Sequence, residues 1–510
     1  MNIVFIMSDS LRYDHLGFTG SGKCETPNLD RFAESAHVFK RAYISSFPTI
    51  PNRWDIFTGR LNHTYARWQP LPADEVVLSQ VLGEGSYKTM MIADTPHILQ
   101  RGFDYQRGFE GFEWVRGQEN DHWKTTPLNP EFPCSPEKLR SPDYTMRHYM
   151  RNRSWWKSAD DCCVSRTMNT AVEWLESNHG EGEFFLYVDT FDPHEPWDAP
   201  AEYNAKYVDP GYKGEEITYP NYCPASCYQE DEIKFMAARY AAEADLVDTQ
   251  VGKVIDAVER LGIGDETAII FTSDHGFSLG DHGVMGKSIV SLGGEGYFES
   301  IPNYEEVAHI PLMIHLPGQN ERKDHNGLVQ SIDMMPTILE MGEVIRTEVV
   351  KGIANIQTIQ CGFHQEVEWS VDVAKLHGYS LCPMMNGEVE KVRDIAVSSA
   401  TLTAETPRIA KATIIVDDWK LVYCGKVVDA ANEMAAPEVP DNRNEGDYVI
   451  GEHKALLFNL KDDPGELKNV IEDNLDVARD LHARYIEFLK DKGTAPELFE
   501  KHREFTVTPG

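Results

Sequence analysis

Two segments of this chain carry side chains that could bind a cation. Asp9 ends an apolar run that begins at residue 2, and Asp274 and His275 lie near the end of another, 267–276. Carboxylate oxygens and an imidazole nitrogen are ordinary ligands of divalent metals. Functional groups of an α/β sheet gather beyond the carboxyl ends of its strands, so these three are expected to meet although they lie far apart in sequence.

A hydroxyl that could act as a nucleophile stands in the segment Thr49-Ile50-Pro51-Asn52-Arg53. A free threonine hydroxyl is a poor nucleophile at neutral pH, and coordination to a metal would lower its pKa and align it for attack. Arg53 offers a planar, permanently charged donor that could hold an oxyanion. These residue types are compatible with covalent catalysis on an anionic ester.

The elements that must position these groups alternate between strand and helix patterns. Apolar runs at 2–8, 89–94, 183–191, 267–276 and 311–316 are typical of buried strands, and 232–262 has apolar residues at helical spacing. Such alternation predicts an α/β fold, with a mainly parallel sheet sandwiched by helices.

The chain divides into two predicted parts. Residues 1–375 form the catalytic α/β domain, and 376–510 form a smaller α+β subdomain that contains a hairpin at 412–425 and an amphipathic helix at 475–493. A Trp-rich stretch at about 112–160 lacks any period and is interpreted as an insertion over the active edge, which could either shape a substrate pocket or be an ordinary excursion.

The charge balance excludes two classes of partner. The chain has 82 acidic and 48 basic side chains and a formal charge of −34, which argues against nucleic acid and anionic membranes. No secretory leader pattern and no apolar run of about 20 residues is found, so a cytoplasmic protein with free thiols is expected. A homo-oligomer is compatible with the sequence but not required by it.

These motifs resemble, in order, those of the sulfatase branch of the alkaline phosphatase superfamily. Its signature is Cys or Ser-x-Pro-x-Arg with Thr-Gly nine and ten residues after the nucleophile, and Thr49, Arg53 and Thr58-Gly59 fall in that register. A rival register starting at Ser46 is wrong by three residues. The resemblance implies an alkaline-phosphatase-like mixed, mainly parallel sheet.

The resemblance also implies roles for individual residues. One metal site would be made by Asp9, Thr49, Asp274 and His275, and the catalytic residues would be Thr49, Arg53, His194 and Lys287. By family position, Lys287 and His194 would bind non-bridging oxygens, and one would protonate the leaving oxygen. His63 and Asn52 are candidate substrate-binding residues.

Thr49 departs from the sulfatase pattern. Sulfatases oxidise Cys or Ser to formylglycine, and threonine cannot give that aldehyde because its β-carbon bears a methyl group. The leading hypothesis is therefore a phosphodiesterase or phosphonate monoester hydrolase that acts through a phosphothreonine. The alternative is a sulfuric ester hydrolase; a phosphoryl transferase and an inactive anion-binding protein are further alternatives.

The metal ligands depart as well. Sulfatases usually bind calcium with a second aspartate after the first strand and with Asp-Asn in the later motif, whereas this chain has Ser10 and His275. Exchanging a carboxylate for an imidazole predicts one divalent ion, manganese first, with zinc or calcium as alternatives. The predicted substrate is a small-molecule phosphate or sulfate ester.

Overall fold

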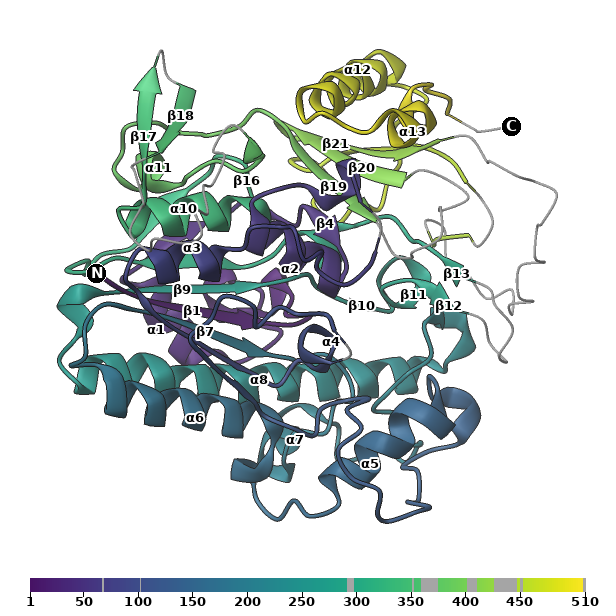
Figure 1. The fold of residues 1–510 in the computed structure, drawn as a ribbon. Coiled ribbons are helices and arrows are strands. Elements are labelled where there is room, and N and C mark those ends of the chain that lie inside the picture. The colour runs from purple at the N-terminus through teal and green to yellow at the C-terminus, as the bar shows by residue number, and fades with distance from the viewer. Residues whose placement is uncertain are drawn as a thin grey trace.

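The computed structural model describes residues 1–507 except 67, 101, 291–297, 351–352, 359–374, 401–410, 426–446 and 450–452. Its centre is an eight-stranded sheet (Figure 1). In spatial order the strands are β15 (Lys323–His325), β2 (His37–Phe39), β14 (Leu312–His315), β9 (Thr267–Ser273), β1 (Asn2–Ser8), β7 (Phe184–Thr190), β5 (Lys88–Ala93) and β6 (Gly111–Trp114).

The first strand of the chain lies inside this sheet. β1 is parallel to both β7 and β9, and β5 and β6 continue the parallel half. β14 runs antiparallel to β9 and to β2. The sheet is therefore mixed and mainly parallel, which confirms the predicted fold class.

Two apolar cores lie on the two faces of the sheet. Successive side chains of a strand point to opposite faces. Accordingly Ile3, Phe5 and Met7 of β1 enter one core, and Val4 and Ile6 enter the other. A continuous apolar run such as 2–8 is what a strand covered on both faces requires.

Helices cover both faces. On one side lie α1 (Pro27–Ala33), α6 (Cys163–Asn178) and α8 (Glu230–Arg260), and on the other α2 (Thr49–Thr58), α3 (Leu78–Glu84) and α10 (Met334–Met341) (Figure 1). Shorter helices are α4 (Pro96–Leu99), α5 (Arg147–Arg153), α7 (Ala201–Tyr207), α9 (Glu305–Ala308) and α11 (Cys382–Met385). The helix predicted at 232–262 is α8.

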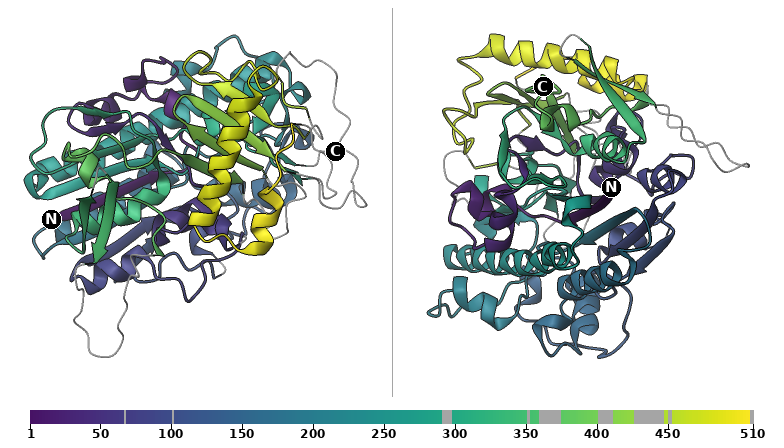
Figure 2. Two further views of the ribbon diagram at one scale, coloured as in Figure 1. Left: turned by 90° about the horizontal axis from the view of Figure 1, so that it is seen from above. Right: turned by 90° about the vertical axis from the view of Figure 1, so that its left-hand side faces the viewer.

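A second sheet has five strands. It runs β22 (Leu456–Asn459), β21 (Trp419–Cys424), β20 (Lys411–Val416), β19 (Ala396–Ala400) and β4 (Ser46–Phe47). The predicted hairpin is β20–β21, and the predicted helix is α12 (Leu475–Asp491), which lies across this sheet (Figure 2). α13 (Pro496–Phe499) follows α12.

β4 joins the two parts of the molecule. It pairs in parallel with β19 although it precedes α2 in the chain, so the second sheet reaches the helix that carries Thr49. The division at residue 375 stays a prediction.

The remaining strands form small sheets. They are β8 (Cys223–Pro224) with β10 (Ser278–Leu279) and β11 (Val284–Gly286), β3 (Ala42–Tyr43) with β16 (Val329–Gln330), β12 (Ile289–Val290) with β13 (Phe298–Glu299), and β17 (Ile345–Val350) with β18 (Ile353–Thr358). Among the described residues, none of the helices has the length and apolarity needed to cross a membrane.

Candidate active site

The sheet register brings the predicted metal ligands together. Ser8 of β1 pairs with Ser273 of β9, so Asp9 and Asp274 follow two aligned strand ends. The ligand atoms of Asp9, Asp274 and His275 lie within 4.8 Å of one another, and all three side chains are fully buried. The convergence expected from the strand ends is therefore what the structure has.

Arg53 occupies the centre of the carboxylates. Its Nη1 lies 2.5 Å from Asp274 Oδ2 and 3.1 Å from Asp9 Oδ2. Its Nε and Nη2 make a two-pronged contact, at 2.8 and 2.9 Å, with Asp189 at the end of β7. Sequence reasoning expected Arg53 to hold the transferring group; in the structure its guanidinium is fully buried among these carboxylates, and that role stays a prediction.

The buried charges around Arg53 do not balance. Three carboxylates, from Asp9, Asp189 and Asp274, face one guanidinium. Burial, followed by the charge of Asp274, raises the pKa of Asp9 above its ordinary range. Since buried charge is costly unless compensated, this excess of negative charge fits a divalent cation bound between Asp9, Asp274 and His275.

Thr49 faces this cluster from the start of α2. Its Oγ1 lies 3.4 Å from His275 Nε2, and its side chain is almost completely buried. The first turn of a helix carries partial positive charge from its unpaired N–H groups, which favours an anion there. The hydroxyl thus lies between a cation site and a helix end that both stabilise negative charge on its oxygen.

Lys287 belongs to the same cluster. It follows β11, and its Nζ lies 3.2 Å from His275 Nε2. Burial, followed by the charge of Lys287, lowers the pKa of His275 far below its ordinary value, so the imidazole is neutral and can be a ligand.

His194 lies on the loop after β7. Its Nδ1 is 2.7 Å from the main-chain oxygen of Glu195, and its ring stacks on Phe191 with a centroid distance of 4.0 Å. Burial, followed by the charges of Lys287 and Arg140, lowers its pKa well below the ordinary value. His194 and His275 are therefore both affected by the charge of Lys287.

The two predicted substrate-binding residues have other contacts. The Asn52 amide donates a hydrogen bond to the main-chain oxygen of Asp274, and its side chain is fully buried. His63 Nδ1 lies 3.1 Å from Ser46 Oγ, which itself donates to Asp55. Both residues support the loop and helix that present Thr49, and their binding of substrate stays a prediction.

Sequence reasoning did not assign four further residues near the cluster. His97 Nε2 lies 3.3 Å from Glu119 Oε2, and Arg140 Nη2 lies 2.6 Å from Glu195 Oε1. His97 stands three residues beyond the predicted strand 89–94, a position that could have marked it. Glu119 and Arg140 come from the stretch 112–160, which has no period from which to place them.

A second acidic cluster lies apart from the first. Ligand atoms of His282, Glu306 and Glu466 are also within 4.8 Å of one another. Here Lys420 supplies the positive charge, because its Nζ lies 2.9 Å from Glu466 Oε1. Like the first cluster, it therefore contains a buried cationic side chain, which here comes from β21.

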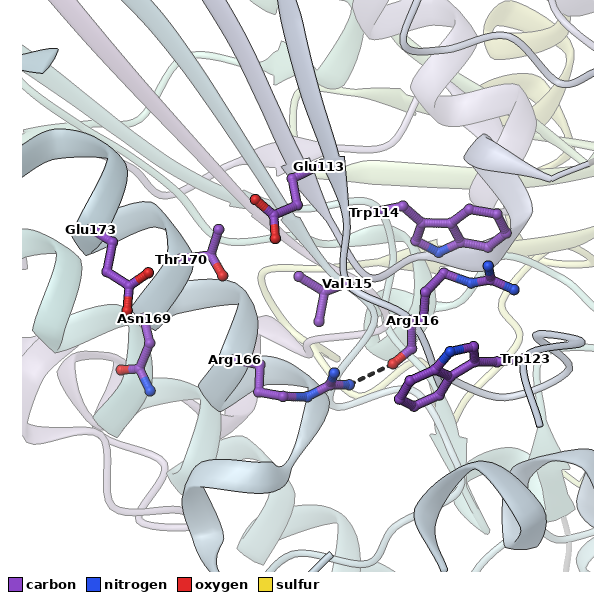
Figure 3. Close-up of a pocket in the computed structure, with 9 residues that line it drawn as sticks. All are labelled: Glu113, Trp114, Val115, Arg116, Trp123, Arg166, Asn169, Thr170 and Glu173. Atoms are coloured by element: carbon purple, nitrogen blue, oxygen red, sulfur yellow. Dashed lines mark hydrogen bonds between the residues drawn. The ribbon is translucent and has the colours of Figure 1, made fainter. Parts of the chain in front are cut away.

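A hollow beside the edge strand β6 is also separate from the cluster (Figure 3). It lies between the end of β6, with Trp114 and Arg116, and α6, where Arg166 donates a 2.5 Å hydrogen bond to the main-chain oxygen of Arg116. None of its lining residues is a predicted site residue.

The fold and this cluster place the chain among alkaline-phosphatase-like α/β hydrolases of ester bonds. Residues 1–344, more than half of the chain, match the family model described as Sulfatase. The chain belongs to the sulfatase family, whose members are metal-dependent, and the predicted resemblance is confirmed.

Two curated relatives carry sulfatase names. The chain is 25% identical over 375 residues to the uncharacterized sulfatase YidJ of Escherichia coli, covering 69% of each chain. It is 24% identical over 399 residues to an arylsulfatase of Clostridium perfringens, covering 69% of this chain and 77% of that one. These names favour the sulfuric ester alternative over the phosphoester hypothesis.

A solved structure shares the fold. The phosphonate monoester hydrolase of Agrobacterium radiobacter matches with a TM-score of 0.64 over 96% of both chains, at 18% identity. At that identity the likeness concerns the fold alone.

Proposed function

We propose that this protein is a sulfuric ester hydrolase in which Thr49 is the nucleophile. The balance of buried charge favours an ester with one negative charge, and the sulfatase names of the family and of the curated relatives favour the sulfuric ester among such substrates. Three carboxylates face Arg53 and Lys287, so one divalent cation leaves a single positive charge in excess. A sulfate monoester carries one negative charge and neutralises that excess, whereas a phosphate monoester carries up to two.

The chain's own residues suggest how the reaction proceeds. The Thr49 oxygen attacks the sulfur, the bond from the sulfur to the leaving oxygen breaks, and the departing alcohol takes up the proton that Thr49 loses. Lys287 stabilises charge on the non-bridging oxygens. Water then attacks the sulfur, the bond from the sulfur to Thr49 breaks, and sulfate leaves as the Thr49 hydroxyl is restored. His194 has its proton on Nδ1, because that atom contacts a carbonyl oxygen, which can only accept. Its Nε2 is therefore free to take a proton from the water that breaks the covalent ester.

The proposed cation is one manganese ion, with zinc or calcium as alternatives. Asp9, Asp274 and His275 would hold it, together with the Thr49 oxygen. When bound, it supplies Lewis-acid stabilisation and lowers the pKa of a coordinated hydroxyl. The single imidazole in the set is the reason for preferring manganese or zinc to calcium.

Thr49 itself favours a second candidate, a phosphodiesterase or phosphonate monoester hydrolase. A phosphodiester also carries a single negative charge, so the same charge balance suits it. Threonine cannot form the formylglycine of sulfatases, whereas a phosphothreonine ester is an ordinary covalent intermediate.

One ratio separates the two candidates. Turnover of the manganese-loaded protein would be measured on an arylsulfate and on the matching aryl phosphodiester. A larger kcat/KM on the arylsulfate supports the sulfuric ester proposal, and a large excess on the phosphodiester would replace it by the second candidate. Loss of both activities in Thr49→Ala is required in either case.

The cellular setting is part of the proposal. The substrate would be a small-molecule ester met in the cytoplasm, with no nucleic acid or membrane partner. The net charge of −34 supports the absence of nucleic acid and anionic membrane partners, because it repels other polyanions.

A further inference from the structure

Two imidazoles share one aromatic support at the edge of the active site. His97 and His194 both stack on Phe191, with centroid distances of 5.3 and 4.0 Å. His97 stands on α4 after β5, and His194 stands on the loop after β7, so the two neighbouring strands present the two rings together.

Each imidazole has its own carboxylate. His97 Nε2 lies 3.3 Å from Glu119 Oε2, and His194 Nδ1 lies 3.2 Å from Glu195 Oε2. Both carboxylates are buried, with side-chain exposures of 4% and 0%. These are ion-pair distances rather than hydrogen bonds, and the hydrogen bond of His194 Nδ1 goes to the main-chain oxygen of Glu195. A carboxylate this close favours a proton on the neighbouring ring nitrogen.

Arg140 connects the two pairs. Its Nη2 lies 2.6 Å from Glu195 Oε1 and 3.4 Å from Glu119 Oε1. Its guanidinium packs over the rings of Tyr222 and Tyr219 at 4.1 and 4.6 Å.

The same tyrosines complete the network. Their hydroxyls donate to the two carboxylates, Tyr222 to Glu195 at 2.6 Å and Tyr219 to Glu119 at 2.7 Å. Arg140 is thus held by stacking and ion pairs at once, an arrangement that lysine could not reproduce.

We propose that Arg140 is a positioning residue for ester hydrolysis, because it holds the two buried carboxylates that lie beside His97 and His194. The inference rests on the proposed function, since it assumes that these imidazoles serve the hydrolytic reaction. It gives the stretch 112–160 a defined task, because both Arg140 and Glu119 come from it.

The charge of Arg140 has a second effect. Burial lowers the pKa of His97 to about 4, with Lys287, Arg140 and Arg53 adding to the shift and Asp9 opposing it. Burial, Lys287, Arg140 and His97 act in the same direction on His194. Removing Arg140 leaves Glu119 and Glu195 without their cation, so the pKa of both imidazoles should rise.

Arg140→Gln removes both the charge and the shape of the guanidinium, whereas Arg140→Lys keeps the charge and removes the shape. Arg147→Gln is the matched control, because Arg147 pairs with exposed Asp143 in the same stretch. The kcat/KM of Arg140→Gln should fall, and the acidic limb of its pH profile should move up by about one pH unit. Arg140→Lys keeps the charge, so its limb should stay near the wild-type pH while kcat falls about 10-fold or more. Arg147→Gln should resemble the wild type.

Imidazole titration by NMR on the zinc- or calcium-loaded protein gives a readout without turnover. Resonances of His97 and His194 are assigned by their loss in His97→Asn and His194→Asn, and both midpoints should rise in Arg140→Gln. If the wild type hydrolyses neither ester, the proposed function fails, while this titration still decides the placement of Arg140.

The positioning role is overturned if Arg140→Gln loses activity equally at every pH with unmoved imidazole midpoints. Should Arg140→Gln fail to fold, Arg140→Lys alone decides: a kcat equal to that of the wild type would also overturn the proposal.

Discussion

The carboxyl edge of the large sheet and the stretch 112–160 contribute to the same site in different ways. At the sheet edge, Asp9 and Asp274 each follow a strand, Asp189 lies near the end of β7, and paired neighbouring strands fix their positions. In the stretch 112–160, Glu119 and Arg140 are held by side-chain contacts to residues far away in the chain.

This difference assigns different tasks to the two regions. The sheet edge is fully buried and carries the proposed cation ligands, and Thr49 faces it from the start of α2. The stretch 112–160 is partly open, with the Arg140 side chain 25% exposed. Its proposed role is to position the imidazoles rather than to bind the cation. We infer that the residues at the sheet edge determine which bond is broken, and that the stretch 112–160 tunes the orientation and pKa of the imidazoles.

The largest effect is expected from Thr49→Ala, at the start of the helix that faces the sheet edge. Loss of the nucleophile should lower kcat/KM at least about 1000-fold while cation binding persists in weakened form. Thr58→Ala is the matched control, because Thr58 ends the same helix and its hydroxyl bonds only to nearby main-chain atoms. Steady-state kinetics with calorimetric metal titration measures both, and unchanged turnover in Thr49→Ala would refute the assignment.

The next effect concerns the cation. Asp274→Asn should weaken binding of manganese or zinc by more than about 100-fold. Asp274 is a proposed metal ligand, and its loss should cost more than the loss of a residue that only hydrogen-bonds to a ligand. Glu306→Gln, in the second acidic cluster, should leave the affinity unchanged, since Lys420 already serves that cluster. If Glu306→Gln weakened metal binding and Asp274→Asn did not, the cation would bind in the second acidic cluster instead.

The difference between the two regions also explains what the sequence could predict. Asp9 and the pair Asp274-His275 could be placed because apolar runs mark strands and parallel strands bring their carboxyl ends to one edge. The register of Thr49 followed from its spacing to Arg53. Glu119 and Arg140 could not be placed, because in a stretch without period no local rule states which distant side chain each will meet.

Other errors have the same physical origin. The start of the stretch 112–160 is the edge strand β6, which the sequence pattern did not separate from the irregular residues after it. A four-residue edge strand is too short to show a period of two. The contribution of β4 to the second sheet likewise depends on a pairing over more than 350 residues.

A third effect compares one ion pair from each region. Asp189→Asn should lower the free energy of unfolding by about 1.5–3 kcal/mol, because it removes the negative charge and one of the two oxygens that accept hydrogen bonds from fully buried Arg53. Asp121→Asn, in the stretch 112–160, should lower the free energy of unfolding by less, because its partner Arg116 is 35% exposed. Urea unfolding measures both, and equal losses would contradict the distinction between the regions.

The smallest effect concerns His63, which separates a supporting role from a substrate-binding one. Burial lowers the pKa of His63 to about 3, so the folded state resists its protonation. The contribution of His63 to stability is therefore lost as the pH falls below its ordinary value of 6.5 toward 3. His63→Gln should reduce the fall in unfolding free energy between pH 7 and pH 5 by about 1–2 kcal/mol.

The KM of His63→Gln decides the matter, with His179→Gln, beyond the end of α6, as the control. A KM equal to that of the wild type, together with the smaller pH dependence of stability, means that His63 supports the loop through Ser46. A raised KM with an unaltered pH dependence of stability would instead make His63 a substrate-binding residue. The substrate site would then include residues after α2 as well as those at the sheet edge.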